Sequence, residues 1–224
     1  MYIILMLAIM VASWAVGARF KSRFAKYAAT PLASGLSGLE IAQKMLRDHD
    51  IHDVKIISTE GQLTDHYNPT NKTVNLSHDV YYGRSVAAAA VSAHEVGHAV
   101  QHARAYSWLQ FRSSMVPALS VASKFMPWLL LGGILTLQVF PQLLLIGIVL
   151  FALTTIFSFV TLPVEFDASR RALVWLNNAN VTSSQQHTQA KDALHWAAMT
   201  YVIAALSSLA TLLYYVMIYM GRRD

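Results

Sequence analysis

Long stretches without a charged residue constrain this chain more than any other feature of its sequence. Residues 1–18, 125–164 and 193–221 contain no Asp, Glu, Lys or Arg. A helix of about 20 apolar residues crosses the ~30 Å hydrocarbon core of a bilayer, so the middle stretch is long enough to cross it twice. The sequence therefore predicts four transmembrane helices and excludes a wholly soluble enzyme.

A proline-containing segment divides the middle stretch into two helices. Pro141 lies within residues 138–142, lacks the backbone N–H and disfavours helix at the residue before it. The predicted organisation is a transmembrane anchor at 1–18, a cytosolic α+β segment at 19–116, a transmembrane helical hairpin at 117–162, a second cytosolic segment at 163–196 and a transmembrane helix at 197–220.

Basic residues orient the predicted helices. None precedes the first apolar stretch, and Arg19, Lys21, Arg23 and Lys26 follow it. A cleaved signal peptide has the opposite polarity, so we expect a retained anchor, with cleavage near 15–18 as the alternative. The positive-inside rule then places the N-terminus outside and both connecting segments, with most of the 17 Lys and Arg, in the cytosol.

The net charge of +5 is expected to reflect basic residues that flank the membrane-spanning helices rather than a nucleic-acid-binding surface. The basic residues flank apolar stretches and form no stripe interleaved with aromatic residues, so the predicted partner is the lipid bilayer. We expect a multi-pass protein of the cell (inner or plasma) membrane.

The first cytosolic segment has the pattern of a small α+β unit. A capping box, Ser37 with Glu40, starts a helix that runs to about Asp48. Strands are predicted at 53–57 and 73–77, the second with one buried face; it either offers its edge to an extended substrate or is covered by its neighbours. Because fewer than ~90 residues bury only a small hydrophobic core, the unit is expected to depend for its stability on packing against the membrane helices or residues 163–196.

An Ala-rich helix predicted at about 85–105 carries the sequence His94-Glu95-Val96-Gly97-His98. Residues four apart on a helix point the same way, so His94 and His98 can bind one ion while Glu95 lies beside it. A carboxylate in that place can take a proton from a metal-activated water. The alternative is a helix with two partly buried, hydrogen-bonded histidines and a surface Glu. Gly97 in mid-helix costs ~1 kcal/mol relative to Ala, which indicates a close packing contact.

The third ligand must come from elsewhere, and with no Cys in the chain it is a His or a carboxylate. His102 lies ~12 Å along the helix axis from His94 and is expected near the site or at the surface. The candidate is Glu165, just past the third apolar helix on the same predicted side as the histidines. The alternative is that Glu165 and Asp167 only pair with the neighbouring arginines. Two His and one Glu with an open position form a catalytic type of zinc site.

A hydrolase of this kind also needs a donor for the oxyanion of its tetrahedral intermediate. The candidates from the sequence are His66, Arg170, His195 and Tyr201, and the pattern does not select one of them.

These motifs carry a family resemblance. The segments 94–102, 63–67 and 165–171 resemble the YugP-type neutral zinc metallopeptidase family, and the similarity covers nearly the whole chain. That family consists of bacterial membrane proteins and is distantly similar to the HtpX-type membrane proteases and the prenyl-protein proteases. In those proteins a Glu after a later membrane helix completes the zinc site, which implies this role for Glu165. In the HtpX type an Asp commonly follows that Glu by four residues, whereas here position 169 is Ser, and Asp167 is expected to face away from Glu165.

The residues and the resemblance together predict a mainly α polytopic membrane protein, with about four transmembrane helices and a small α+β cytosolic metalloprotease unit that carries the HExxH helix. The expected function is that of a membrane zinc endopeptidase with one Zn²⁺ at His94, His98 and Glu165, and with Glu95 as general base. The expected partners are polypeptide substrates, in particular membrane or membrane-proximal proteins. A non-catalytic zinc-binding membrane scaffold or regulator, and a zinc hydrolase acting on a lipid or small amide, are the alternatives.

Overall fold

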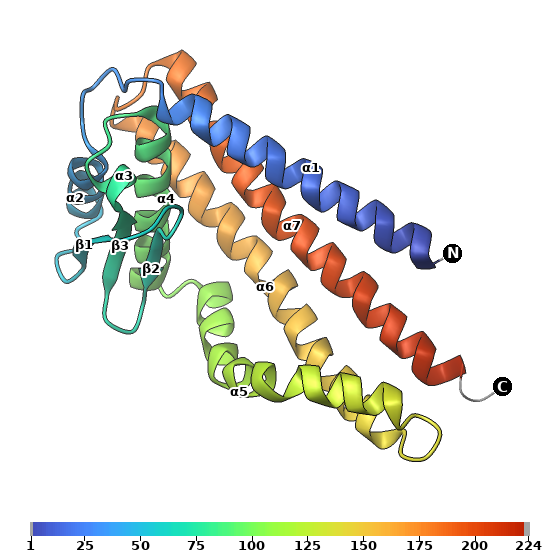
Figure 1. Cartoon of the computed structure of the whole chain (residues 1–224). Coiled ribbons are helices and arrows are strands. Elements are labelled where there is room, and N and C mark those ends of the chain that lie inside the picture. The colour runs from blue at the N-terminus through green and yellow to red at the C-terminus, as the bar shows by residue number, and fades with distance from the viewer. Residues whose placement is uncertain (1, 222–224) are drawn as a thin grey trace.

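Four long helices contain the apolar stretches of the sequence. The computed structural model describes residues 2–221, and in this part of the chain four helices are long and apolar enough to cross a membrane: α1 (Tyr2–Ala28, counted from Ile4), α5 (Ser107–Leu135), α6 (Gln142–Asn178) and α7 (Ser184–Met220). Helix α7 packs between α1 and α6, and α5 packs on α6 (Figure 1). The predicted break before residue 142 is confirmed, since α5 ends at Leu135 and α6 begins at Gln142.

The helices extend beyond the apolar stretches that predicted them. Helix α1 continues to Ala28 rather than ending near residue 18, and α6 continues to Asn178 rather than ending near 162. Hydropathy marks only the part of a helix that matches lipid, whereas a helix ends where capping and packing end it. Pro163 lies within α6 without terminating it. Helix α5 contains Pro117 and Pro127 and is visibly bent (Figure 1).

A small mixed unit lies at one end of the long helices (Figure 1). It contains α2 (Gly38–Asp48), β1 (Lys55–Thr59), β2 (His66–Asn68), β3 (Thr73–Ser77), α3 (His78–Tyr81) and α4 (Val86–Ala103). The strand order is β1-β3-β2, with β1 parallel and β2 antiparallel to β3. The capping box of α2 is confirmed, because the Ser37 hydroxyl accepts from the Glu40 N–H and the Glu40 carboxylate accepts from the Ser37 N–H.

The prediction of one buried face for residues 73–77 is wrong. Strand β3 is central, and all five of its residues are buried. Its apolar residues Val74 and Leu76 join the core with α2 and α4. Its polar face is covered as well, because the side chains of Thr73, Asn75 and Ser77 are buried and the Ser77 hydroxyl donates to the carboxylate of Asp65 at 3.1 Å. Of the two alternatives for this strand, coverage by neighbours is the correct one, and β2, which covers one of its edges, was not predicted.

The small unit shares its core with the long helices, as expected from its size. The buried cluster that includes Ile41 of α2 and Val96 of α4 continues into Leu176 of α6 and Leu194 of α7. Trp175 of α6 also donates to the Asp48 carboxylate at 2.9 Å. The unit that carries the HExxH helix is therefore held against α6 and α7 by packing.

Helix α4 approaches the backbone of α6 closely at Gly97. A Cβ at this position would lie 2.7 Å from the backbone oxygen of Ala168, closer than real Cβ atoms come to other atoms. The close contact predicted from the mid-helix glycine is confirmed, and it brings α4 against the part of α6 that contains Glu165.

We expect Gly97→Ala to destabilise the protein although alanine favours helix. Overpacking against backbone costs ~1–3 kcal/mol and the helix gain is ~1 kcal/mol, so the net loss is up to about 2 kcal/mol. The measurement is the midpoint of thermal unfolding in detergent, together with zinc content. Gly17→Ala in α1 is the matched control, because its Cβ would meet nothing within 4 Å. An equal or higher midpoint for Gly97→Ala than for the wild type would contradict this reading of the contact.

Candidate metal centre

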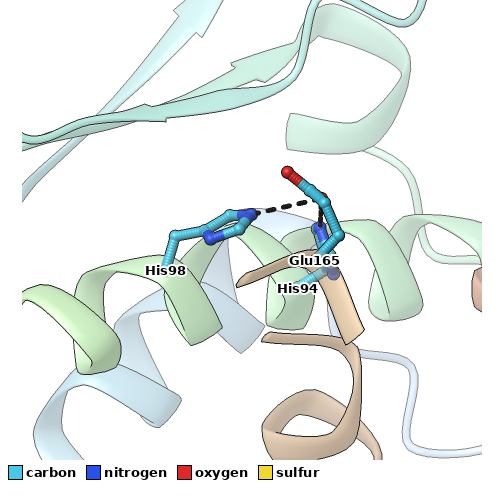
Figure 2. Close-up of side chains that lie close together, drawn as sticks. All are labelled: His94, His98 and Glu165. Carbon is cyan, nitrogen blue, oxygen red and sulfur yellow. Dashed lines mark hydrogen bonds and ion pairs between the residues drawn. The ribbon is translucent and has the colours of Figure 1, made fainter. Parts of the chain in front are cut away.

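Three side chains from two helices converge at the junction of α4 and α6. Nε2 of His94 lies 3.2 Å from Oε2 of Glu165, and Nε2 of His98 lies 3.6 Å from the same oxygen (Figure 2). The Glu165 side chain is only 4% exposed. Among residues 2–221, these three form the one group of His, Cys, Asp or Glu side chains placed to hold a metal ion, with all ligand atoms within 4.8 Å of one another.

The donor set fits a zinc ion. Ligands at ~2.0–2.1 Å from a tetrahedral ion lie about 3.3 Å from one another, close to the two distances between Glu165 and the imidazoles. Two imidazole nitrogens and a carboxylate oxygen leave the fourth position of a tetrahedron free, as in catalytic zinc sites. The predicted convergence of His94, His98 and Glu165 is therefore present in the structure.

Gln101 orients the imidazole of His98. Its Nε2 donates to the backbone oxygen of Val164 at 2.8 Å and to the carboxylate of Asp167 at 2.9 Å. Because both acceptors require a donor, they determine the orientation of the Gln101 amide, and its Oε1 therefore faces Nδ1 of His98 at 3.0 Å. Because Oε1 can only accept, Nδ1 of His98 carries a proton, and Nε2 is the nitrogen that would bind a metal ion.

Asp167 and Ser169 support the site in ways the sequence did not indicate. Asp167, expected to face away from Glu165, is buried and reaches the site through Gln101, and it also pairs with Arg170 and Arg171. The Ser169 hydroxyl lies 3.1 Å from Nδ1 of His94, so it contacts the first histidine as Gln101 contacts the second. The one signal for Gln101 was its place one turn after His98 on the same face of the helix.

We expect Gln101→Leu to weaken zinc binding by about 10–100-fold, because groups that orient metal ligands have effects of that size. The measurement is competition for zinc with a chelator of known affinity. Gln43→Leu is the matched control, since Gln43 is an exposed residue of α2. An unchanged zinc affinity for Gln101→Leu would show that the amide does not hold His98 in its binding orientation.

Glu95 is a buried carboxyl group beside the two histidines of the candidate metal centre. Its burial raises the pKa of its carboxyl above the ordinary value, with the charges of Glu165 and Asp65 acting in the same direction and the two histidines opposing them. A raised pKa makes the carboxylate a better proton acceptor. A metal dication next to it would oppose this rise, so the two effects together determine its basicity.

Two cavities of about 220 Å³ each meet at the centre, and His94, Glu95 and Glu165 border both of them. Of the four predicted oxyanion donors, Tyr201 borders both cavities and His66 borders one. Arg170 and His195 instead line a separate cavity between α6 and α7.

His102 of α4 and Arg112 of α5 lie near the candidate metal centre but are not among its three candidate ligands. His102 lies apart from the ligand group, and its Nδ1 is 2.7 Å from the hydroxyl of Tyr67 on β2, which agrees with the expectation that it is no ligand.

Arg112 of α5, which the sequence did not single out, lies with Nη1 3.8 Å from Oε1 of Glu165. Glu165 therefore faces the histidines and Arg112, and among the described ion pairs Arg170 and Arg171 bind Asp167 instead.

The fold and the site define a class: a mainly helical protein with four candidate membrane-spanning helices, in which the helix that carries His94 and His98 and a long apolar helix together form a candidate metal centre. The chain belongs to the family described as "Putative neutral zinc metallopeptidase", whose family model matches residues 2–220. It is also 40% identical over 224 residues to the "Putative membrane protease YugP" of Bacillus subtilis (strain 168), covering 100% of this chain and 99% of that protein. The resemblance predicted from the motifs is thereby confirmed. No solved structure matches the chain.

Proposed function

We propose that this protein is a zinc-dependent endopeptidase that hydrolyses peptide bonds of membrane or membrane-proximal proteins. The observation that supports it most is the convergence of His94 and His98 with Glu165, at distances that suit ligands of one tetrahedral ion. Membership of the zinc metallopeptidase family and the likeness to a protein named a membrane protease support the same activity.

The residues at the candidate metal centre would have different roles in peptide hydrolysis. A zinc ion held by the three ligands would lower the pKa of a water molecule to about 7 and polarise the substrate carbonyl. Glu95 would accept the proton of the attacking water and pass it to the leaving amine. Tyr201, His66 and Arg112 border the same space and are the donors available to the developing oxyanion.

We also propose that the site faces the cytosol and that its substrates reach it at the membrane surface. Arg19, Lys21, Arg23 and Lys26 lie at the end of α1 that packs towards the small unit, and the positive-inside rule favours this end in the cytosol (Figure 1). Glu165 lies in α6, the most apolar of the four long helices of the described chain, so a substrate at the centre lies close to lipid.

The rival function, a non-catalytic zinc scaffold, gives no role to Glu95. A buried carboxylate that neither binds the ion nor pairs with a cation lowers stability, because burial costs free energy for a charge without a partner. Its burial next to the two histidines favours catalysis over a purely structural use of the ion.

The experiment that tests the proposal compares one unfolded polypeptide in two forms, soluble and tethered to a membrane by a transmembrane segment. We expect the purified protein in proteoliposomes to cleave the tethered form at least about tenfold faster, because tethering raises its local concentration. A zinc chelator should stop cleavage and added zinc should restore it. Equal cleavage of both forms would refute the substrate preference, and zinc-independent or absent cleavage would refute the peptidase itself.

A further inference from the structure

One of the two cavities at the metal centre is walled mainly by apolar residues from α1 and α7. Its side walls include Phe20 and Phe24 of α1 and Ala193, Ala197 and Ala198 of α7, and its inner end is formed by the residues of the centre. We call it the α1–α7 pocket. Helix α1, predicted only as a membrane anchor, thus borders the candidate active site.

The two cavities at the centre differ in character. Away from the three candidate ligands, the α1–α7 pocket is lined mainly by apolar side chains, whereas the other cavity combines apolar residues with His66 of β2 and with Arg112 and Ser113 of α5. A polypeptide whose cleaved bond lay at the metal centre would therefore have a mainly apolar environment on one side of that bond and, on the other, a mixed environment that includes the cation Arg112.

The size of the α1–α7 pocket limits what can occupy it. Its volume is about 220 Å³, below the ~300–1,000 Å³ typical of pockets for whole drug-sized ligands. On the α7 side the three alanines have short side chains that leave space in the pocket. On the α1 side the pocket is bordered by the rings of Phe20 and Phe24, whose centroids are 5.8 Å apart. The space suits one large apolar side chain.

We infer that the α1–α7 pocket binds a single large apolar side chain of the polypeptide substrate next to the cleaved bond, with Phe20 and Ala197 setting the size that it accepts. This inference rests on the proposed peptidase function and names the substrate feature that the site selects. It makes α1 a specificity element as well as a membrane anchor.

The test measures binding, so that it does not depend on turnover. The full-length, zinc-loaded protein in detergent is titrated with hydroxamates that chelate the ion and differ in one substituent: methyl, isobutyl, naphthylmethyl or n-decyl. We expect the wild type to bind the isobutyl compound at least about tenfold more tightly than the methyl compound, as contacts in a fitted apolar pocket discriminate by that amount.

Two variants should change the size preference in opposite directions. Ala197→Phe fills the pocket and is expected to remove the advantage of isobutyl over methyl. Phe20→Ala enlarges it and is expected to raise affinity for the naphthylmethyl compound at least about fivefold over the wild type. Ala204→Phe is the matched control, because Ala204 is an exposed residue of α7 away from the pocket and the same substitution there should leave all four affinities unchanged.

Each outcome decides the inference. A preference for isobutyl that Ala197→Phe removes supports size selection of an apolar group by the α1–α7 pocket; if the protein then cleaves no polypeptide, the proposed function fails separately, and the group selected is not a substrate side chain. Equal affinities for methyl and isobutyl overturn it, even if membrane-tethered polypeptides are cleaved. Affinity that is highest for n-decyl also overturns it, because the pocket then takes an acyl chain. If Ala197→Phe lowers zinc content or the unfolding midpoint, Phe20→Ala decides alone: an unchanged naphthylmethyl affinity rejects the role of α1.

Discussion

Glu95→Gln is expected to reduce peptide hydrolysis by about 10²–10⁴-fold while the protein keeps one zinc ion, because general-base catalysis contributes a factor of that size. Glutamine has nearly the shape of glutamate but cannot accept the proton of the attacking water at neutral pH. Glu95 also lies outside the group of three ligand side chains, so the change leaves the ligands in place. The measurements are the initial rate of cleavage and the zinc content of the same preparation.

Replacement of another acidic residue provides the control for this variant. Glu60→Gln removes a carboxylate from an exposed residue of the small unit and should change neither rate nor zinc content. A Glu95→Gln protein that cleaves at the wild-type rate would remove the reason for reading the centre as catalytic, and the zinc scaffold would become the better description.

Glu165→Ala is expected to lower zinc affinity by more than a hundredfold and to abolish cleavage with it. Loss of a group that only orients a ligand costs about 10–100-fold, and loss of a ligand costs more. The variant also leaves Arg112 near two imidazoles without the carboxylate that faces all three groups. The measurement is a competitive zinc titration, with Glu60→Ala as the exposed control.

A second variant separates ligation from folding at this position. Glu165→Gln keeps the volume and one acceptor oxygen of the side chain but removes its charge, so the protein should fold and still bind zinc more weakly than the wild type. Full zinc affinity in both Glu165 variants would mean that the third ligand lies elsewhere and that the meeting of α4 and α6 has another purpose.

The sequence predicted the long helices well and their ends poorly. The charge-free stretches and Pro141 were sufficient to locate four helices and the break before α6. They could not show that α6 continues past Pro163 to Asn178, because its last turns are held by packing of residues such as Leu176 against the small unit. Strand β2 has three residues and exists through its pairing with β3, a contact that no local pattern reports.

The candidate site shows the same division between local and distant information. The spacing of His94, Glu95 and His98 is a local property of one helix, and the sequence alone placed both imidazoles on one face with Glu95 beside them. Gly97 likewise indicated a close contact before its partner was known, and that partner is the backbone at Ala168.

The apolar helices, the HExxH pair of imidazoles and the candidacy of Glu165 could thus all be predicted without coordinates. Three contacts emerged only from the folded chain: Glu165 meets both histidines, Gln101 links His98 to Asp167, and Phe20 of α1 borders the same space. They could not be predicted because helical periodicity relates residues within a few turns, whereas these contacts join helices far apart in the chain. Their distances depend on how closely α1, α4, α6 and α7 pack.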